Sequence, residues 1–213
     1  MKISKLLLVP LALTISNASL AEKNPFYIGF GLGYYDLDGQ KARSGHYLDG
    51  QRFGDQTNSL NIYLGYNFNP YFSVEAAYSN FGSAQDEYLS PVTYYDEWEE
   101  KYINTYVEDD ETLEVSSFQL NGVAHYPVLE KLTLSANLGI SYTRVDSEFR
   151  PVSTWWSLIS PVERYSEKDV DLTYGLGAKY DFTDKFSGKL QWKTIDNDIV
   201  AVNGFDLSLE ARF

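Results

Sequence analysis

The chain has 213 residues, no cysteine and 34 aromatic residues (18 Tyr, 12 Phe and 4 Trp), and 30 Asp and Glu outnumber 17 Lys and Arg, which gives a formal net charge of −13. This length suits one domain with a buried core, and an aromatic share of 16% is too high for a disordered acidic chain. Without cysteine, disulfides, thiolate metal sites and Cys nucleophiles are excluded. The acidic balance argues against a nucleic-acid partner, because phosphates require a basic surface, and we expect no cofactor.

The N-terminus has the pattern of a secretory signal peptide. Lys2 and Lys5 form a short basic region, residues 6–15 are apolar, and small residues follow. Ser19 and Ala21 fit the −3 and −1 positions of a signal peptidase site. We therefore expect residues 1–21 to be cleaved from an exported protein, which excludes a cytoplasmic role.

A short membrane anchor is the alternative interpretation of this N-terminal segment. Its apolar stretch is well below the roughly 20 residues that a spanning helix needs, and it contains Pro10. Cleavage leaves a single domain, residues 22–213. It also removes two lysines, so the net charge falls from −13 to −15.

Eight segments of the mature chain alternate between apolar and polar residues. A period of two is typical of β-strands, and about ten residues is the length that a tilted strand needs to cross a bilayer. None of the segments is a continuous apolar run long enough for a transmembrane helix. The eight predicted strands are 26–35, 59–68, 72–81, 117–126, 132–143, 170–181, 186–195 and 205–213.

The two faces of these predicted strands differ in composition. One face takes the even positions of the first seven segments and the odd positions of the last, and 38 of its 42 residues are aliphatic or aromatic, with no charge. The other face has only 7 such residues among 41 positions and holds every charge of the eight segments. This distribution is typical of a barrel with a lipid-facing exterior and a polar interior.

The connections between the segments alternate in length. Three are short turns, whereas the other four run from nine residues to more than thirty. A soluble sandwich or a lipocalin also alternates, but edge strands interrupt the apolar face of such folds, and here that face is nearly unbroken. The sequence therefore predicts an all-β fold: an eight-stranded antiparallel up-and-down transmembrane β-barrel with short periplasmic turns and long extracellular loops.

Aromatic residues gather at both ends of the apolar face, where amphipathic rings would meet lipid headgroups. A general preference of aromatics for strands does not explain their concentration at segment ends. The predicted periplasmic band is Phe26, Phe68, Phe72, Tyr126, Tyr180, Phe186 and Phe213, and the outer band is Tyr34, Tyr78, Tyr142, Trp192 and Phe205.

Two stretches resemble a known family. Residues 64–78, Leu-Gly-Tyr-Asn-Phe-Asn-Pro-Tyr-Phe-Ser-Val-Glu-Ala-Ala-Tyr, are similar to the second hairpin of small OmpA-like outer-membrane barrels. Residues 204–213 resemble the alternating C-terminal signal, closed by Phe, that the barrel assembly machinery reads. The residues of this signal are Phe205, Leu207, Leu209 and Phe213.

The resemblance covers the whole mature chain and implies a location in the cell outer membrane. It implies outer-membrane lipid, lipopolysaccharide, the assembly machinery and periplasmic chaperones as partners. Because the chain ends with the eighth predicted strand, we do not expect a peptidoglycan-binding domain.

The polar face places charges inside the predicted barrel. An eight-stranded barrel is just wide enough for its own side chains, and charge in a low dielectric must be paired. Counted from the turns, Glu75, Lys189 and Glu210 lie at similar depth. We expect Lys189 to contact Glu210 or Glu75, with Arg212 or Lys179 serving the other carboxylate. We interpret this network as a plug, and a narrow ion path gated by the same pairs is the alternative.

The two histidines are candidates for catalysis, because lipid A-modifying enzymes of this architecture combine a His with a Ser and an acidic residue. His46 lies in the first long connection near Ser44 and Asp49. His125 lies near the periplasmic end of the fourth strand, and two residues later the chain has Pro127 in place of a serine. A lone His with Ser and Asp nearby is a weak signal, so we expect no enzymatic activity.

The second long connection is the most biased segment of the chain. Residues 82–112 hold ten acidic residues and six aromatics against one basic residue, Lys101, so their net charge is −9. We interpret this segment as a solvated loop. Two functional alternatives are divalent-cation bridging to lipopolysaccharide phosphates and recognition of a host or phage protein through exposed aromatics.

These features predict an integral outer-membrane β-barrel protein with a structural and surface-interaction role. A small-solute or ion channel is the second interpretation, and a lipid A-modifying enzyme is the third. The sequence names no ligand, because in such a fold the loops carry function.

Overall fold

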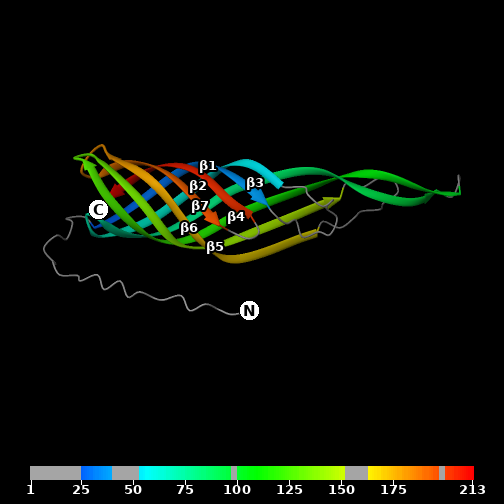
Figure 1. Cartoon of the computed structure of the whole chain (residues 1–213), viewed down its shortest axis with the longest axis horizontal. Coiled ribbons are helices and arrows are strands. Elements are labelled where there is room, and N and C mark those ends of the chain that lie inside the picture. Colours follow the sequence, from blue (N-terminus) through cyan, green and yellow to red (C-terminus); the bar gives the residue numbers. More distant parts are fainter. Residues whose placement is uncertain (1–24, 40–52, 97–99, 152–162, 197–199) are drawn as a thin grey trace.

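Eight antiparallel strands form a closed barrel in the computed structural model of the protein, which describes residues 25–39, 53–96, 100–151, 163–196 and 200–213 (Figure 1). Each strand pairs with its neighbours in sequence, and β1 closes the sheet on β8 from Tyr27↔Arg212 to Gly39↔Val200. The strands are β1 (Phe26–Gly39), β2 (Phe53–Asn69), β3 (Phe72–Asp96), β4 (Lys101–Leu129), β5 (Leu132–Pro151), β6 (Glu163–Asp181), β7 (Phe186–Asp196) and β8 (Val200–Arg212). The predicted fold class is confirmed.

The alternation of the sequence sets the inside and the outside of the barrel. The apolar face points outward, so that Leu134, Leu138 and Ile140 of β5 expose 46%, 61% and 55% of their surface. Between them, Asn137 and Ser141 are buried in the lumen. The aromatic residues of both predicted bands lie on the outer surface, and of these Trp192 is half-buried. The predicted orientation of the two faces is therefore confirmed.

The mature sequence contains no apolar run long enough for a transmembrane helix. Across the residues that the structure describes, no helix is long and apolar enough to span a membrane.

Several strands are longer than predicted where the chain leaves the barrel. β3 and β4 continue as a long ribbon, paired from Ser83↔Glu114 to Asp96↔Lys101, which reaches far beyond the barrel in Figure 1. At the base of the ribbon β5 also pairs with β4, as far as Asp109↔Pro151. The expectation that residues 82–112 form a loop is therefore wrong. Alternation could not reveal this ribbon, because a ribbon outside the membrane needs no apolar face toward lipid.

The ribbon begins at a bulge in β3. The register between β3 and β4 shifts between Asn80 and Ser83, and Gly82 in this step has a φ of 78°. A Cβ at Gly82 would lie 2.5 Å from Thr57 Oγ1, and side chains other than glycine are strained at this φ. The backbone N–H of Gly82 donates to Asn80 Oδ1 at 2.8 Å. The bulge redirects β3 from the barrel wall into the ribbon.

The last residue of the chain lies at the seam where the barrel closes. The backbone N–H of Phe213 donates to the carbonyl oxygen of Phe26 at 3.0 Å, and the two rings stack with centroids 6.3 Å apart. We predict that Phe213→Asp reduces insertion into the outer membrane, because it removes this stacking and the terminal aromatic residue of the predicted assembly signal. Heat-modifiable electrophoretic migration and surface proteolysis of whole cells measure insertion. Phe213→Tyr is the control and should insert normally, and normal insertion of the Asp variant would contradict the prediction.

Candidate functional site

Two Tyr–Gly pairs between β1 and β2 shape the periplasmic half of the lumen. Tyr27 is paired with Gly65, and Gly29 is paired with Tyr63. Each ring covers the facing glycine so closely that a Cβ on either glycine would overlap the ring. The two rings also meet edge to face, with centroids 6.4 Å apart. The missing side chain on one strand therefore makes room for the large ring on the other.

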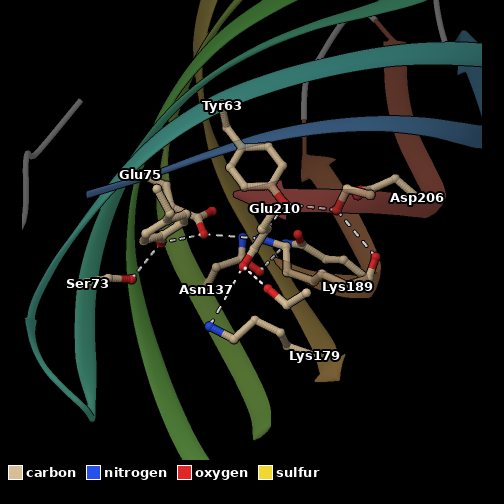
Figure 2. A network of polar contacts seen from close by, with 12 residues as sticks. Tyr63, Ser73, Glu75, Asn137, Lys179, Lys189, Asp206 and Glu210 are labelled. Atoms are coloured by element: carbon tan, nitrogen blue, oxygen red, sulfur yellow. Dashed lines mark hydrogen bonds and ion pairs between the residues drawn. The ribbon is translucent and has the colours of Figure 1, made fainter. Parts of the chain in front are cut away.

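Lys189 lies at the centre of a buried ionic cluster, which consists of Glu75, Lys179, Lys189 and Glu210 (Figure 2). Its Nζ is 3.0 Å from Glu75 Oε1 on β3 and 3.5 Å from Glu210 Oε1 on β8. Lys179 Nζ on β6 is 3.8 Å from Glu210 Oε2. All four side chains are at most 10% exposed. Two ammonium groups and two carboxylates balance one another here, as charges removed from water require.

Tyr27 and Tyr63 hold the carboxylates of the ionic cluster. Tyr27 Oη donates to Glu75 Oε1 at 2.8 Å, and Tyr63 Oη donates to Glu210 Oε1 at 3.0 Å. Ser187 Oγ donates to Glu210 Oε2 at 3.2 Å. Lys189 Nζ also lies 4.2 Å from the centroid of the Tyr63 ring, within range of a cation–π interaction. The Tyr–Gly pairs therefore position the hydrogen-bond donors that complete the cluster.

Two details differ from the arrangement predicted by counting from the turns. Lys189 is paired with Ser208 and Glu210 with Ser187, so the two charged residues are diagonal rather than directly opposed. Arg212 lies outside the ionic cluster, because its Nη2 binds Asp181 Oδ1 at 2.6 Å. Strands in a closed barrel are tilted and staggered, and equal distances from a turn do not give equal depths.

Polar residues continue along the lumen toward the extracellular side. Gln191 Nε2 donates to Asn137 Oδ1 at 2.8 Å. Beyond this contact, Lys193 Nζ lies 4.0 Å from Asp206 Oδ2, which also accepts a hydrogen bond from Tyr35 Oη at 2.9 Å. The lumen thus contains a second buried charge pair, which the sequence-based network did not include.

An apolar cluster fills the extracellular end of the lumen. The rings of Tyr35 and Phe81 meet edge to face at 4.9 Å in this outer apolar cluster. The alternating pattern did not predict this cluster, although Tyr35, Phe81 and Ile195 stand out as apolar residues on the polar face. The other members lie beyond the predicted strand ends. The complete outer apolar cluster is Tyr35, Leu37, Phe81, Ala84, Val115, Val145, Ile195, Val200 and Val202.

The structure brings a serine to His125 from the neighbouring strand. His125 Nε2 lies 2.8 Å from Ser73 Oγ. His125 Nδ1 is buried and has no hydrogen-bond partner within the part of the chain that the structure describes. A Ser–His pair without a carboxylate to orient the imidazole does not complete a catalytic triad.

Other predicted features are outside the described residues or do not form a site within them. The predicted cleavage residues Ser19 and Ala21, and His46, lie outside the described residues. Among the described residues, no three His, Cys, Asp or Glu side chains gather into a group that could hold a metal ion.

Comparison with known proteins identifies the family. A family model described as the outer membrane protein beta-barrel domain matches residues 6–213, and the chain belongs to this family. No curated protein sequence matches the chain. The class defined by this fold is therefore the outer-membrane β-barrel proteins.

Several solved structures share the fold at low sequence identity. Ail, the attachment invasion locus protein of Yersinia pestis, crystallised with the heparin analogue sucrose octasulfate, is 16% identical with a TM-score of 0.52, over 89% of this chain and 99% of that one. Neisserial surface protein A is 12% identical with a TM-score of 0.56, over 88% and 97% of the two chains. The N-terminal barrel of Pseudomonas aeruginosa OprF is 11% identical with a TM-score of 0.52, over 89% and 98%. At these identities the similarity shows the fold alone.

The Tyr–Gly pairs can be tested with two glycine substitutions. Gly65→Ala would force the Tyr27 ring away from its place over β2 and disturb its hydrogen bond to Glu75, so we predict a loss of about 1–3 kcal/mol in the free energy of unfolding. Gly122→Ala is the control, because a Cβ there has only Leu138 O within 4 Å, at 3.7 Å. Urea unfolding after refolding into lipid vesicles measures both. Equal stability of the two variants would contradict the role of the Tyr–Gly pairs.

Removing Glu210 tests the ionic cluster itself. Glu210→Ala leaves Lys179 without its carboxylate and Lys189 with Glu75 alone, so we expect a loss on the order of 3 kcal/mol in the free energy of unfolding. Glu114→Ala removes an exposed carboxylate from β4 and should change stability by no more than about 0.5 kcal/mol. The same urea unfolding experiment measures both variants. A Glu210→Ala variant as stable as the Glu114→Ala control would refute the structural role of the cluster.

Proposed function

We propose that this protein is a closed barrel that anchors an extracellular ribbon in the outer membrane, and that the ribbon contacts a partner at the cell surface. The ribbon is β3 from Ser83 to Asp96 and β4 from Lys101 to Glu114. The observation that carries the proposal is the continuous pairing of these strands to Asp96↔Lys101, where a solvated loop was expected. An ordered ribbon can present side chains in fixed positions, whereas a disordered loop would lose entropy on binding.

Two layers of side chains support a closed lumen. The ionic cluster lies on the periplasmic side, and the outer apolar cluster lies on the extracellular side. An ion that crossed the barrel would have to separate the buried charge pairs and then enter an apolar layer, and both steps are costly. This arrangement favours a plug over the alternative of a small-solute or ion channel.

The charge and the aromatic residues of the ribbon indicate the chemistry of the partner. In the ribbon, Asp86 is paired with Glu111 and Glu87 with Asp110. Residues 82–112 hold ten acidic residues against Lys101 as the one basic residue, and this charge favours a positively charged partner. Near the tip, Tyr95 and Tyr102 form an edge-to-face pair and remain 50% and 74% exposed. Exposed tyrosines beside charge are typical of protein-binding surfaces.

The complex of Ail offers a contrast in charge. The heparin analogue in that structure is an octasulfate, a strongly anionic ligand. Residues 82–112 carry a net charge of −9 here, so the ribbon should repel such a ligand. We therefore infer a basic protein surface as the partner of the ribbon.

A lipid A-modifying enzyme remains the third interpretation. The Ser73–His125 pair is the geometry that bears on it, and the imidazole lacks an orienting carboxylate among the described residues. This arrangement supports a non-enzymatic protein.

The C-terminal segment also bears on how the protein reaches the membrane. We propose that periplasmic chaperones deliver the chain and that the barrel assembly machinery inserts it, because residues 204–213 resemble the signal that this machinery reads.

Conductance measurements distinguish the plug from the channel. Purified protein in a planar bilayer should show no steady conductance, and Glu210→Ala should lower stability without opening a pore, because the outer apolar cluster remains. Steady ion conductance of the wild-type protein, or its appearance in the Glu210→Ala variant, would favour the channel.

The tip tyrosines test the surface-interaction role. We predict that Tyr95→Ser/Tyr102→Ser reduces the binding of expressing cells to immobilised basic serum and matrix proteins about tenfold. An aromatic side chain that becomes buried when a partner binds contributes about 1–2 kcal/mol or more to the binding free energy. A control variant, Tyr71→Ser, changes an exposed tyrosine at the periplasmic turn and should bind normally. Flow cytometry of cells with matched surface expression measures binding. Equal binding by the tip variant would contradict the proposed role of the ribbon.

A further inference from the structure

Two basic side chains face outward from β5 and β6 at the outer edge of the lipid-facing surface. Arg144 on β5 is directly paired with Lys168 on β6, and both are exposed. On the same face, the neighbouring outward residues on the membrane side are Tyr142 and Val170, which are 47% and 63% exposed. We call Arg144 and Lys168 the basic pair.

The length of the apolar run fixes the level of the basic pair in the membrane. On β6 the outward residues from Val170 to Tyr180 span ten residue steps, and on β5 the run from Leu132 to Tyr142 has the same length. At a rise of about 3.3 Å per residue and a tilt of about 40°, ten steps cover roughly 25 Å, the height of the apolar band of an outer-membrane barrel. The next outward residues, Arg144 and Lys168, therefore lie at the level of the headgroups of the outer leaflet.

The basic pair is confined to one side of the barrel. In the described parts of the other six strands, the exposed charged residues at comparable outward positions are Asp36, Glu114 and Asp196, and none is Lys or Arg. In a mature chain expected to carry −15, two adjacent cations at one level are a local exception. An anion at this level would be attracted to the β5–β6 face and repelled by the rest of the rim.

The basic pair is incompletely neutralised by its neighbours. Arg144 Nε lies 2.8 Å from Asp146 Oδ2, and Nη2 donates to Asp146 Oδ1 at 2.9 Å. Burial alone would raise the pKa of Asp146, but hydrogen bonds from Arg144 and Ser166 hold the pKa below its ordinary value, so Asp146 stays charged and fixes the guanidinium. The positive charge of Lys168 also lowers the pKa of Asp146, so this one carboxylate faces two cations. Like charges directly opposite each other destabilise a sheet, and an anion bound between Arg144 and Lys168 would reverse this effect.

We propose that Arg144 and Lys168 form a binding site for a phosphate group of lipid A in the outer leaflet. The guanidinium held by Asp146 presents its remaining N–H groups, and the ammonium of Lys168 supplies the second positive charge. Charge complementarity and depth select this ligand: a phosphate carried by a lipid at the headgroup level meets both residues, while its acyl chains lie against the apolar surface below Tyr142. The site is separate from the ribbon surface proposed above, and its failure would leave that proposal unchanged.

Binding of lipid A by purified protein in detergent micelles tests this site. We compare wild-type protein, Arg144→Gln/Lys168→Gln, and the control Lys131→Gln/Lys185→Gln, which removes two exposed positive charges from periplasmic turns. Native mass spectrometry and a fluorescent lipid A titration measure retention and affinity. The expected result is affinity about tenfold weaker for the Arg144/Lys168 variant, with the control equal to wild type.

Two further arms identify the source of the phosphate. Lipid A from which both phosphates have been removed should bind all three proteins equally and more weakly. Inorganic phosphate at equal concentration should not displace lipid A. The proposal is overturned if the Arg144/Lys168 variant binds lipid A as the control does, if removing the phosphates leaves affinity unchanged, or if inorganic phosphate competes as well as lipid A, which would show an adventitious ion only. Heat-modifiable migration confirms that every variant is folded.

Discussion

The closure of β1 on β8 is the constraint on which the rest of this structure depends. In hydrocarbon no water is present to bind a free N–H or C=O group, so a sheet can cross a membrane only when it has no edge. Closure also separates the two faces of every strand. Leu138 must then face lipid while Asn137 faces the lumen, and a shift of one residue would exchange them.

Once the barrel is closed, its interior has a fixed and small volume, and the side chains must fill it. The glycines on β1 and β2 make room for Tyr27 and Tyr63, whose hydroxyls reach Glu75 and Glu210. The carboxylates in turn hold Lys189, whose side chain is buried in the lumen. The ionic cluster thus depends on the packing of uncharged neighbours. The outer apolar cluster completes the filling at the extracellular end and forms a base beneath the ribbon.

Outside the membrane these constraints relax. The ribbon of β3 and β4 extends beyond the barrel, so its sequence needs no apolar face toward lipid and can carry a net charge of −9 between residues 82 and 112. The bulge at Gly82 marks the change from the wall of the barrel to the ribbon. The barrel wall supports the extracellular ends of the strands, where the proposed contacts with a partner and with lipid A are located.

The sequence by itself determined the number of strands, their order, and which face of each meets lipid, because a period of two and a charge-free face leave one arrangement for a chain in a bilayer. It also identified Glu75, Lys189 and Glu210 as charges that must find one another. Tertiary structure decided the rest. Strand stagger made Glu75 the nearest carboxylate to Lys189 and directed Arg212 to Asp181. Pairing between strands, rather than any apolar pattern, extended β3 and β4 into a ribbon. The depth of a side chain in a tilted, closed sheet and the pairing of strands beyond the membrane are properties of the whole barrel. The alternation of residues along one strand therefore does not predict them.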